Sequence, residues 1–303
     1  MVKTPGVVRV AAVGDIHLGR AAYGPPIQTL FAEVAERADV LALCGDLTDR
    51  GEPEEGRQLG RALATIGVPI VAVLGNHDYE SAKVSELSQI LREAGVQVLD
   101  GGEAVEIHGV GFAGVKGFAG GFGRRALGPW GEETIKHFVR EAVEEALKLE
   151  TSLSKLRTER RVALLHYSPI VGTVEGEPRE IYPYLGSSRL EEPLIRYPVD
   201  VVFHGHAHHG ALEGKTVGGV TVYNVSLALL QRSFPDAPPY KVVELRTSGP
   251  QERREDGQPE RRIDRPTDRR AESQPGRRAA ETVRVAGDSP DGGQRPKKGT
   301  EPG

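Results

Sequence analysis

The stretch VRVAAVGDIH, residues 8–17, decides the fold of this chain, because an apolar run rich in valine passes directly into Gly14, Asp15 and His17. Such a run predicts a buried strand that ends at a polar site. Asp15 and His17 are two residues apart, so in extended backbone their side chains would point the same way. This strand end therefore offers one carboxylate and one imidazole to a common neighbour.

Four further apolar runs, at residues 40–43, 70–74, 162–165 and 199–203, also predict buried strands that end at polar residues. Taken singly, a Gly-Asp or Asn-His pair is common in turns, and a lone histidine is ordinarily structural. Because sites in open α/β sheets form at the carboxyl ends of strands, five such ends in succession indicate one shared metal site. The polar segments that follow these four runs are GDLTDRG (45–51), GNHD (75–78), His166 and GHAH (205–208).

The segments between and after the first three predicted strands have apolar residues at helical spacing. This spacing is found at residues 26–37, 54–66 and 81–94, and strands that alternate with helices predict an α/β fold. Residues 104–115 and 217–226 look instead like alternating strands joined at glycine turns. We therefore expect mixed sheets rather than purely parallel winding.

The composition changes near residue 247, which divides the chain into a folded domain at 1–246 and a tail at 247–303. The tail is dense in Arg, Glu, Asp, Pro, Gly and Gln and has no aromatic residue. Such a segment cannot bury enough apolar surface to offset its chain entropy, so we predict a disordered tail. Its repeated arginine pairs suggest a nucleic-acid arm, but interleaved acidic residues favour a solvated segment.

Charge and cysteine content limit the partners and the compartment. With 39 Lys+Arg against 43 Asp+Glu, the formal net charge of −4 provides no basic field for a polyanion, so nucleic acid is disfavoured as a partner. The one cysteine, Cys44, cannot form an internal disulfide and is expected to be buried, inert and in a reducing compartment. We find no signal-peptide core and no run of about eighteen apolar residues. The expectation is a cytoplasmic protein without a membrane span.

The order GDIH, GDLTDRG, GNHD, His166 and GHAH resembles the calcineurin-like metallophosphoesterase superfamily over about residues 8–246. The resemblance implies a four-layer αββα sandwich, in which two packed mixed sheets are flanked by helices and a dinuclear metal centre lies at the strand ends. It also implies that Asp46 bridges the two ions. The other implied ligands are Asp15, His17 and His208 for one ion, and Asn76, His166 and His206 for the other.

Imidazole and carboxylate donors suit Mn, Fe, Zn or Ni better than Mg or Ca, which prefer oxygen ligands alone. We therefore expect two divalent transition-metal ions as cofactors. Two ions about 3.5 to 4 Å apart can share a hydroxide that attacks phosphorus in line. A metal-bridging hydroxide would then be the nucleophile of an enzyme that hydrolyses phosphate esters.

The resemblance also implies a catalytic set around GNHD. His77 resembles the family's acid or leaving-group stabiliser, and Asp49 would orient it. Arg50 matches a position that contacts phosphate oxygens in some related phosphatases, and its planar donor fork suits that task. Asp78, which follows His77, completes the predicted catalytic set.

Several other residues and segments near these motifs also need an explanation. His204 and His209 flank the GHAH motif but do not fit the ligand spacing, so we interpret them as bystanders. Gly109–Gly114 matches a dinucleotide fingerprint but opens no helix, and is rejected. Residues 117–131 and 171–188 are long connections in which we expect substrate selectivity to reside; for the first, a plain surface loop is an equal alternative to a mobile lid.

The predicted substrate is a phosphodiester rather than a monoester, because no basic residue of the phosphatase type follows GNHD. One alternative is a nuclease, since DNA-repair exonucleases share these motifs; the negative net charge and the lack of a separate capping domain disfavour it. Another is an inactive protein-binding scaffold, disfavoured because every ligand position and His77 are filled. The natural substrate, the metal pair and the oligomeric state are left open by the sequence.

Overall fold

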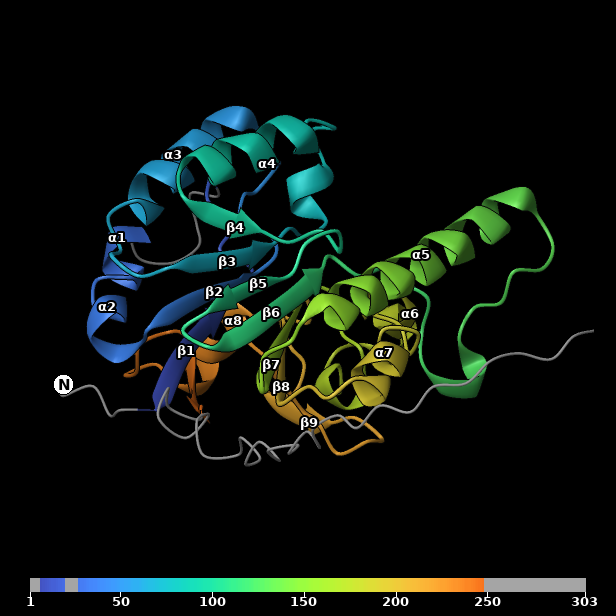
Figure 1. Ribbon diagram of the computed structural model, residues 1–303. Coiled ribbons are helices and arrows are strands. Elements are labelled where there is room, and N and C mark those ends of the chain that lie inside the picture. The colour runs from blue at the N-terminus through green and yellow to red at the C-terminus, as the bar shows by residue number, and fades with distance from the viewer. Residues whose placement is uncertain (1–5, 20–26, 248–303) are drawn as a thin grey trace, which may run out of the picture. The chain divides into compact units, whose positions relative to one another are not determined.

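The computed structural model describes residues 6–19 and 27–247 (Figure 1). From residue 248 on, the expected tail lies outside the described residues. The strands are β1 Val7–Val13, β2 Val40–Cys44, β3 Ile70–Val73, β4 Val96–Val98, β5 Val105–Ile107, β6 Val110–Val115, β7 Arg160–Leu165, β8 Val201–His204, β9 Glu213–Lys215, β10 Thr221–Asn224 and β11 Lys241–Arg246. The helices are α1 Ile27–Leu30, α2 Val34–Arg37, α3 Pro53–Leu63, α4 Val84–Glu93, α5 Glu133–Lys155, α6 Tyr182–Leu185, α7 Glu191–Arg196 and α8 Leu227–Ser233, with short 3-10 helices η1 His77–Tyr79, η2 Gly123–Arg125, η3 Val171–Thr173 and η4 Arg179–Ile181.

The first sheet has the strand order β11-β1-β2-β3-β4. Strands β1 to β4 are parallel, and β11 pairs antiparallel with β1. Every residue of β2 and β3 is buried. This agrees with their continuous apolar sequences, because a parallel strand is covered on both faces and has no solvent side to make polar.

The second sheet has the order β5-β6-β7-β8-β10-β9. Its four inner strands, β6, β7, β8 and β10, are parallel, while β5 and β9 pair antiparallel at the two edges. Both sheets are therefore mixed, as expected. The pattern at 104–115 corresponds to the antiparallel pair β5 and β6, whereas 217–226 contains one strand, β10, and the antiparallel strand β11 of the first sheet was not among the expected elements. The expected α/β class is confirmed.

The hydrophobic core lies between the two sheets. One buried cluster joins Val10 and Leu43 of the first sheet to Phe112, Leu164 and Phe203 of the second. On the outside, α3 and α4 lie over the first sheet in Figure 1, whereas α5 and α7 pack with the second sheet. The order of layers is thus helix, sheet, sheet, helix, which is the four-layer αββα sandwich that the motifs imply.

Two differences from the sequence expectations concern helices. The helix expected at 26–37 is divided into α1 and α2, because Ala32 and Val34 donate to carbonyls three residues earlier, at Thr29 and Phe31, and this tighter turn interrupts the α-helical ladder. The 23-residue helix α5 was not among the expected elements, although buried residues recur along it at helical spacing. Within residues 6–19 and 27–247, no helix has the length and apolar character that crossing a bilayer requires.

Candidate metal centre

The five polar strand ends meet at one place. Strands β1, β2 and β3 of the first sheet and β7 and β8 of the second each end next to a predicted ligand. Since β1, β2 and β3 are parallel to one another, as are β7 and β8, the carboxyl ends of these strands lie together within each sheet. The predicted ligands and acid that follow these strands are, in chain order, Asp15, His17, Asp46, Asn76, His77, His166, His206 and His208.

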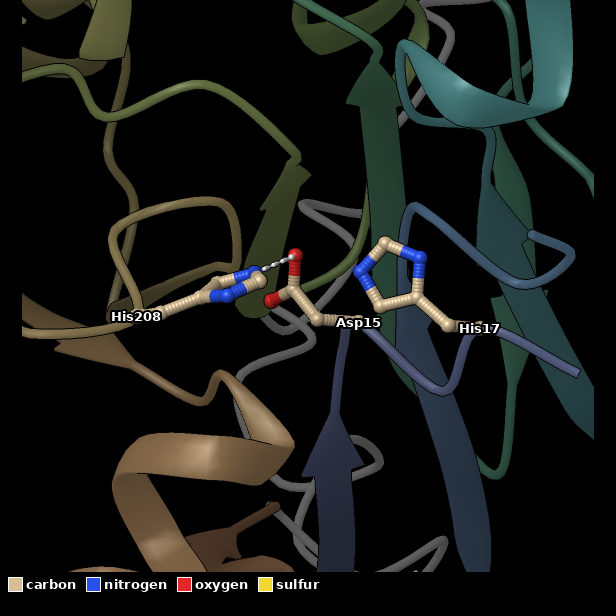
Figure 2. Close-up of side chains that lie close together, drawn as sticks. All are labelled: Asp15, His17 and His208. Atoms are coloured by element: carbon tan, nitrogen blue, oxygen red, sulfur yellow. Dashed lines mark hydrogen bonds and ion pairs between the residues drawn. The ribbon is translucent and has the colours of Figure 1, made fainter. Parts of the chain in front are cut away.

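The first group of donors is Asp15, His17 and His208, whose ligand atoms all lie within 4.8 Å of one another. Figure 2 shows the Asp15 carboxylate between the two imidazoles. Nε2 of His208 is 3.2 Å from Oδ1 of Asp15. Nε2 of His17 is 3.8 Å from Oδ2 of Asp46, which connects this group to the next one.

The second group is Asp46, His166 and His206. Nε2 of His166 lies 3.4 Å from Oδ1 of Asp46 and 2.8 Å from Oδ1 of Asn76. Asp46 therefore approaches His17 with one carboxylate oxygen and His166 with the other. This is the placement that a bridging carboxylate requires.

The contact between His166 and Asn76 tests whether these residues fit a metal. Nδ1 of His166 is 3.1 Å from the carbonyl oxygen of Cys44, to which only a protonated nitrogen can donate. A neutral ring has one proton, so Nε2 is then a lone-pair donor that faces a second lone-pair donor, Oδ1 of Asn76. A cation held by both atoms satisfies the contact, and the carbonyl of Cys44 orients the ring from behind.

The charges at the site also fit divalent cations. Burial and the nearby negative charge of Asp15 raise the pKa of Asp46 well above its ordinary value. Burial would raise the pKa of Asp15 as well, but the hydrogen bond and charge of His208 lower it. Burial lowers the pKa of His17 to about 4 and also lowers that of His166, so both rings are neutral. Neither carboxylate forms an ion pair with a described lysine or arginine, and this concentration of buried acceptors is suited to cations.

The backbone at the ligands is strained. Asp15, His17, Asp46 and His206 have φ angles of 58°, 47°, 48° and 70°, and they are four of the six non-glycine residues with positive φ in the described part of the chain. Each such residue costs on the order of 1–3 kcal/mol and persists only where its surroundings enforce it. The expectation that Asp15 and His17 converge because their backbone is extended is therefore wrong: β1 ends at Val13, and the two side chains converge from a left-handed loop.

The motif glycines allow the backbone to approach the carboxylates. A Cβ at Gly75 would lie 2.2 Å from Oδ1 and 2.3 Å from the backbone nitrogen of Asp46. A Cβ at Gly205 would lie 2.6 Å from Oδ2 of Asp15. Since real Cβ atoms essentially never come within 3.0 Å of such atoms, these positions require glycine for the carboxylates to stay where they are.

The predicted acid, His77, lies beside the first group. Its ring centroid is 4.6 Å from that of His17, and its Nδ1 is 2.7 Å from the backbone carbonyl oxygen of Asp49. Asp49 thus contacts His77 through its backbone, while its carboxylate lies 3.9 Å from His17 and 3.8 Å from Nε of Arg50. The Arg50 side chain is 74% exposed.

Asp78 has a different environment from the other members of the predicted catalytic set. It is fully buried, and its Oδ1 accepts hydrogen bonds from the backbone and hydroxyl of Thr48 at 2.9 and 2.6 Å. Its Oδ2 accepts from the backbone nitrogens of Leu47 and Gly75 at 3.1 and 2.8 Å. The three bonds from Leu47 and Thr48 join the loop after β2 to the loop after β3, the two loops that present Asp46 and Asn76, and the bond from Gly75 lies within the second loop.

Some contacts of the site have no signal in the sequence. The carbonyl of Cys44 orients His166, and the carbonyl of Tyr184 lies 3.1 Å from Nε2 of His206. Both are backbone atoms, so the residue type does not reveal them. A third group of potential ligand atoms, His17, Asp49 and His77, lies beside the first. His204, interpreted from the sequence as a bystander, is fully buried, contacts Thr173 through Nε2 at 2.8 Å and belongs to none of the three groups found in the described residues.

Comparisons with known proteins give the family of the chain and structures of similar fold. The family model described as "Calcineurin-like phosphoesterase" matches residues 8–210. Among solved structures, the phosphopantetheinyl hydrolase PptH from Mycobacterium tuberculosis is similar with a TM-score of 0.55 at 15% identity, over 79% of this chain and 97% of that one. A structure described as a novel archaeal phosphodiesterase is similar with a TM-score of 0.33 at 14% identity, over 78% and 99% of the two chains. No curated protein matches the sequence.

Proposed function

Since this chain belongs to the calcineurin-like phosphoesterase family and is a metal-dependent hydrolase of phosphate esters, we propose that it acts on phosphodiesters at a centre of two divalent transition-metal ions. The single observation that carries the proposal is the position of Asp46. One of its oxygens faces the first group of donors through His17, and the other faces the second group through His166.

We assign one ion to Asp15, His17, Asp46 and His208 and the other to Asp46, Asn76, His166 and His206. The mixture of nitrogen and oxygen donors favours Mn, Fe, Zn or Ni. Bound there, such ions would polarise the phosphoryl oxygens and supply an activated water at neutral pH. The chain's own contribution is to hold the donors in strained, buried positions before substrate arrives.

His77 is assigned the proton that the leaving alkoxide takes. Its Nδ1 donates to the backbone carbonyl of Asp49 at 2.7 Å, which fixes the ring and makes Nε2 the atom for proton transfer. The exposed guanidinium of Arg50 is assigned to substrate phosphate oxygens, and the Asp49 carboxylate beside it restricts its direction. Asp78 is a positioning residue, because its four hydrogen bonds hold the ligand loops together and leave it no contact with substrate.

The preference for a diester rests on charge around His77. Nδ1 of His77 is 3.5 Å from the carboxylate of Glu80, the Asp49 carboxylate belongs to the same group of potential ligand atoms as His77, and Nε of Arg50 lies 3.8 Å from Asp49. A phosphomonoester carries a second negative charge that would meet these acids. A diester carries one and is repelled less.

The proposal is tested by loading the purified protein with Mn, Fe, Zn or Ni and measuring its hydrolysis of bis(p-nitrophenyl) phosphate and of p-nitrophenyl phosphate. Elemental analysis should find two ions per chain, and the diester should have the higher kcat/KM. Asp46→Asn should lose both ions and activity, whereas Asp236→Asn, at an exposed position, serves as the matched control. One ion per chain, or faster turnover of the monoester, would overturn the corresponding part of the proposal.

The same metal-loaded protein distinguishes the proposed enzyme from the two alternatives, a nuclease and an inactive protein-binding scaffold. A nuclease would cleave DNA, and its affinity for DNA would fall steeply as the salt concentration increases. An inactive scaffold would retain metal and hydrolyse neither p-nitrophenyl ester. The complete donor set and the adjacent His77 favour the enzyme over the scaffold.

A further inference from the structure

A cavity of about 730 Å³ is lined by residues that adjoin the GNHD loop, although none of the assigned metal ligands lines it. Its walls come from α4, from residues 98–102 and from α5, and it is lined by both Leu74 and Tyr79. These two residues stand immediately before and after the GNHD motif at 75–78. A substrate whose phosphate lies at the metal ligands could therefore extend into this cavity, which is large enough for a nucleoside-sized group.

Lys116, at the end of β6, brings a positive charge to the cavity wall. Its Nζ donates one hydrogen bond, to the carbonyl of Gly117 at 2.8 Å. The same ammonium lies 5.4 Å from the ring centroid of Tyr79, 4.8 Å from that of Phe118 and 5.5 Å from that of Tyr167. An ammonium has three donors, so this environment of rings leaves two donors for a ligand.

The cavity's other two basic groups already have acidic partners. Lys148 donates to Glu145 at 2.7 Å, and Arg92 lies 3.6 Å from the carboxylate of Glu103. Among the described residues that line the cavity, Lys116 is the basic side chain with no carboxylate within ion-pair distance. It is therefore the group best able to accept an anion from outside.

Burial lowers the pKa of Lys116, and the charges of Glu145 and Glu141 act against that, but neither carboxylate lies within ion-pair distance of Nζ. Glu145 is buried and uses its second oxygen to accept a hydrogen bond from the backbone nitrogen of Gly117 at 2.8 Å. Asp100 and Glu144 are exposed side chains, whose charges water and salt screen.

Lys116 also lies close to the metal ligands. Its backbone carbonyl accepts hydrogen bonds from the nitrogens of His166 and Tyr167, both at 3.0 Å. The Tyr167 ring in turn lies 4.5 Å from the ring of His206, so a single aromatic ring separates the ammonium from a metal-ligating imidazole.

We propose that this cavity binds the organic part of the substrate and that Lys116 recognises a second anionic group on it, a phosphate or a carboxylate, beyond the phosphodiester that is cleaved. The inference rests on the proposed function for the position of the reacting phosphate. It predicts a preference among diesters that the metal centre alone would not produce.

The experiment uses two probes that differ by one anionic group: the p-nitrophenyl ester of thymidine 5′-monophosphate and the same compound with an added 3′-phosphate. Wild-type protein should have a lower KM for the 3′-phosphorylated probe, by about tenfold, because a charge-assisted hydrogen bond contributes that much or more. Lys116→Met, which retains an apolar chain among the rings, should abolish the preference. Lys116→Arg should retain it.

The control variant is Lys136→Met, a lysine on α5 outside the cavity lining, which should leave the ratio of the two KM values unchanged. Thermal unfolding verifies that each variant is folded. An unchanged ratio in Lys116→Met, or a wild-type preference for the probe without the 3′-phosphate, would overturn the inference.

A binding measurement tests the cavity site independently of the proposed hydrolytic function. If neither probe is hydrolysed, isothermal titration calorimetry measures their binding to wild-type protein and to Lys116→Met. Tighter binding of the 3′-phosphorylated probe that disappears in Lys116→Met supports the cavity site even then. Equal binding of both probes by the two proteins refutes it.

Discussion

Replacement of Gly75 by alanine is a one-carbon perturbation of the metal centre that leaves every predicted ligand in the sequence. The added Cβ would lie 2.2 Å from Oδ1 of Asp46, 2.3 Å from its backbone nitrogen and 2.8 Å from Cε1 of His166. Two of these atoms belong to Asp46, the proposed bridging residue, and the third to His166, a proposed ligand of the second ion. None of them is the free end of a flexible exposed side chain, so the backbone or the ligands must move.

The expected size of the effect follows from these distances. Asp46 must retreat by roughly 1 Å to restore an acceptable contact, and a displacement of that size in a catalytic site costs about 100-fold in rate. Overpacking of a buried position costs about 1–3 kcal/mol of stability. We therefore expect Gly75→Ala to fold with a lowered Tm, to bind at least one ion more weakly and to lose about 100-fold in kcat/KM.

The assay combines thermal unfolding, metal content after dialysis and hydrolysis of bis(p-nitrophenyl) phosphate. Gly172→Ala is the control, because its added Cβ would meet nothing closer than Ile170 at 4.0 Å and its φ is not positive. If Gly75→Ala retained both ions and wild-type turnover, the close approach of Gly75 to Asp46 would not be what holds the bridging carboxylate, and the geometric explanation of the motif glycines would be refuted.

Three further perturbations have distinct signatures. His77→Gln should lower kcat by a factor of about 10²–10⁴ with metal content unchanged, because it removes the proton donor but no assigned ligand. If elemental analysis instead showed that the variant had lost metal, His77 would be placed among the ligands. Asp78→Asn turns an amide NH₂ toward either the Leu47 and Gly75 amides or the Thr48 donors, so urea unfolding should show a loss of about 1–3 kcal/mol; wild-type stability would contradict the positioning role. Removal of metal by a chelator should lower the Tm, since ions at 100 times their Kd stabilise the folded state by about 2.7 kcal/mol; a Tm that does not respond to added Mn²⁺ or Zn²⁺ would show that no ion binds the folded chain.

The elements nearest the site were predictable because their signals are local. The valine-rich run before Gly14 predicts a strand, and β1 Val7–Val13 confirms it. The runs before Gly45 and Gly75 likewise correspond to β2 and β3. The runs of β2 and β3 are apolar over their whole length because a parallel strand in this sandwich is covered on both faces, so their burial is visible without knowledge of the partners, whereas β1 carries the half-buried Arg9.

Convergence of the site residues was an inference from order along the chain, and only the packing of two sheets brings them together. His166 and His206 come from the second sheet and Asp46 and Asn76 from the first, so the distances among them depend on how the sheets face each other. The same holds for the close approach of Gly75 to Asp46 and for the four hydrogen bonds of Asp78. Apart from the bond between Gly75 and Asp78, these contacts join residues about thirty positions apart, and a sequence pattern carries no distance between them.

The sequence by itself determined the strands that end at the site, the mixed α/β class and the residue types that can hold a cation, because periodicity and donor chemistry are properties of neighbouring residues. Tertiary structure alone decided the left-handed backbone at Asp15 and His17, the carbonyl of Cys44 behind His166, and the cavity that Lys116 lines. These features arise where separate strands, loops and helices press against one another. Their geometry is set by the packing of the whole core, which no short stretch of residues specifies.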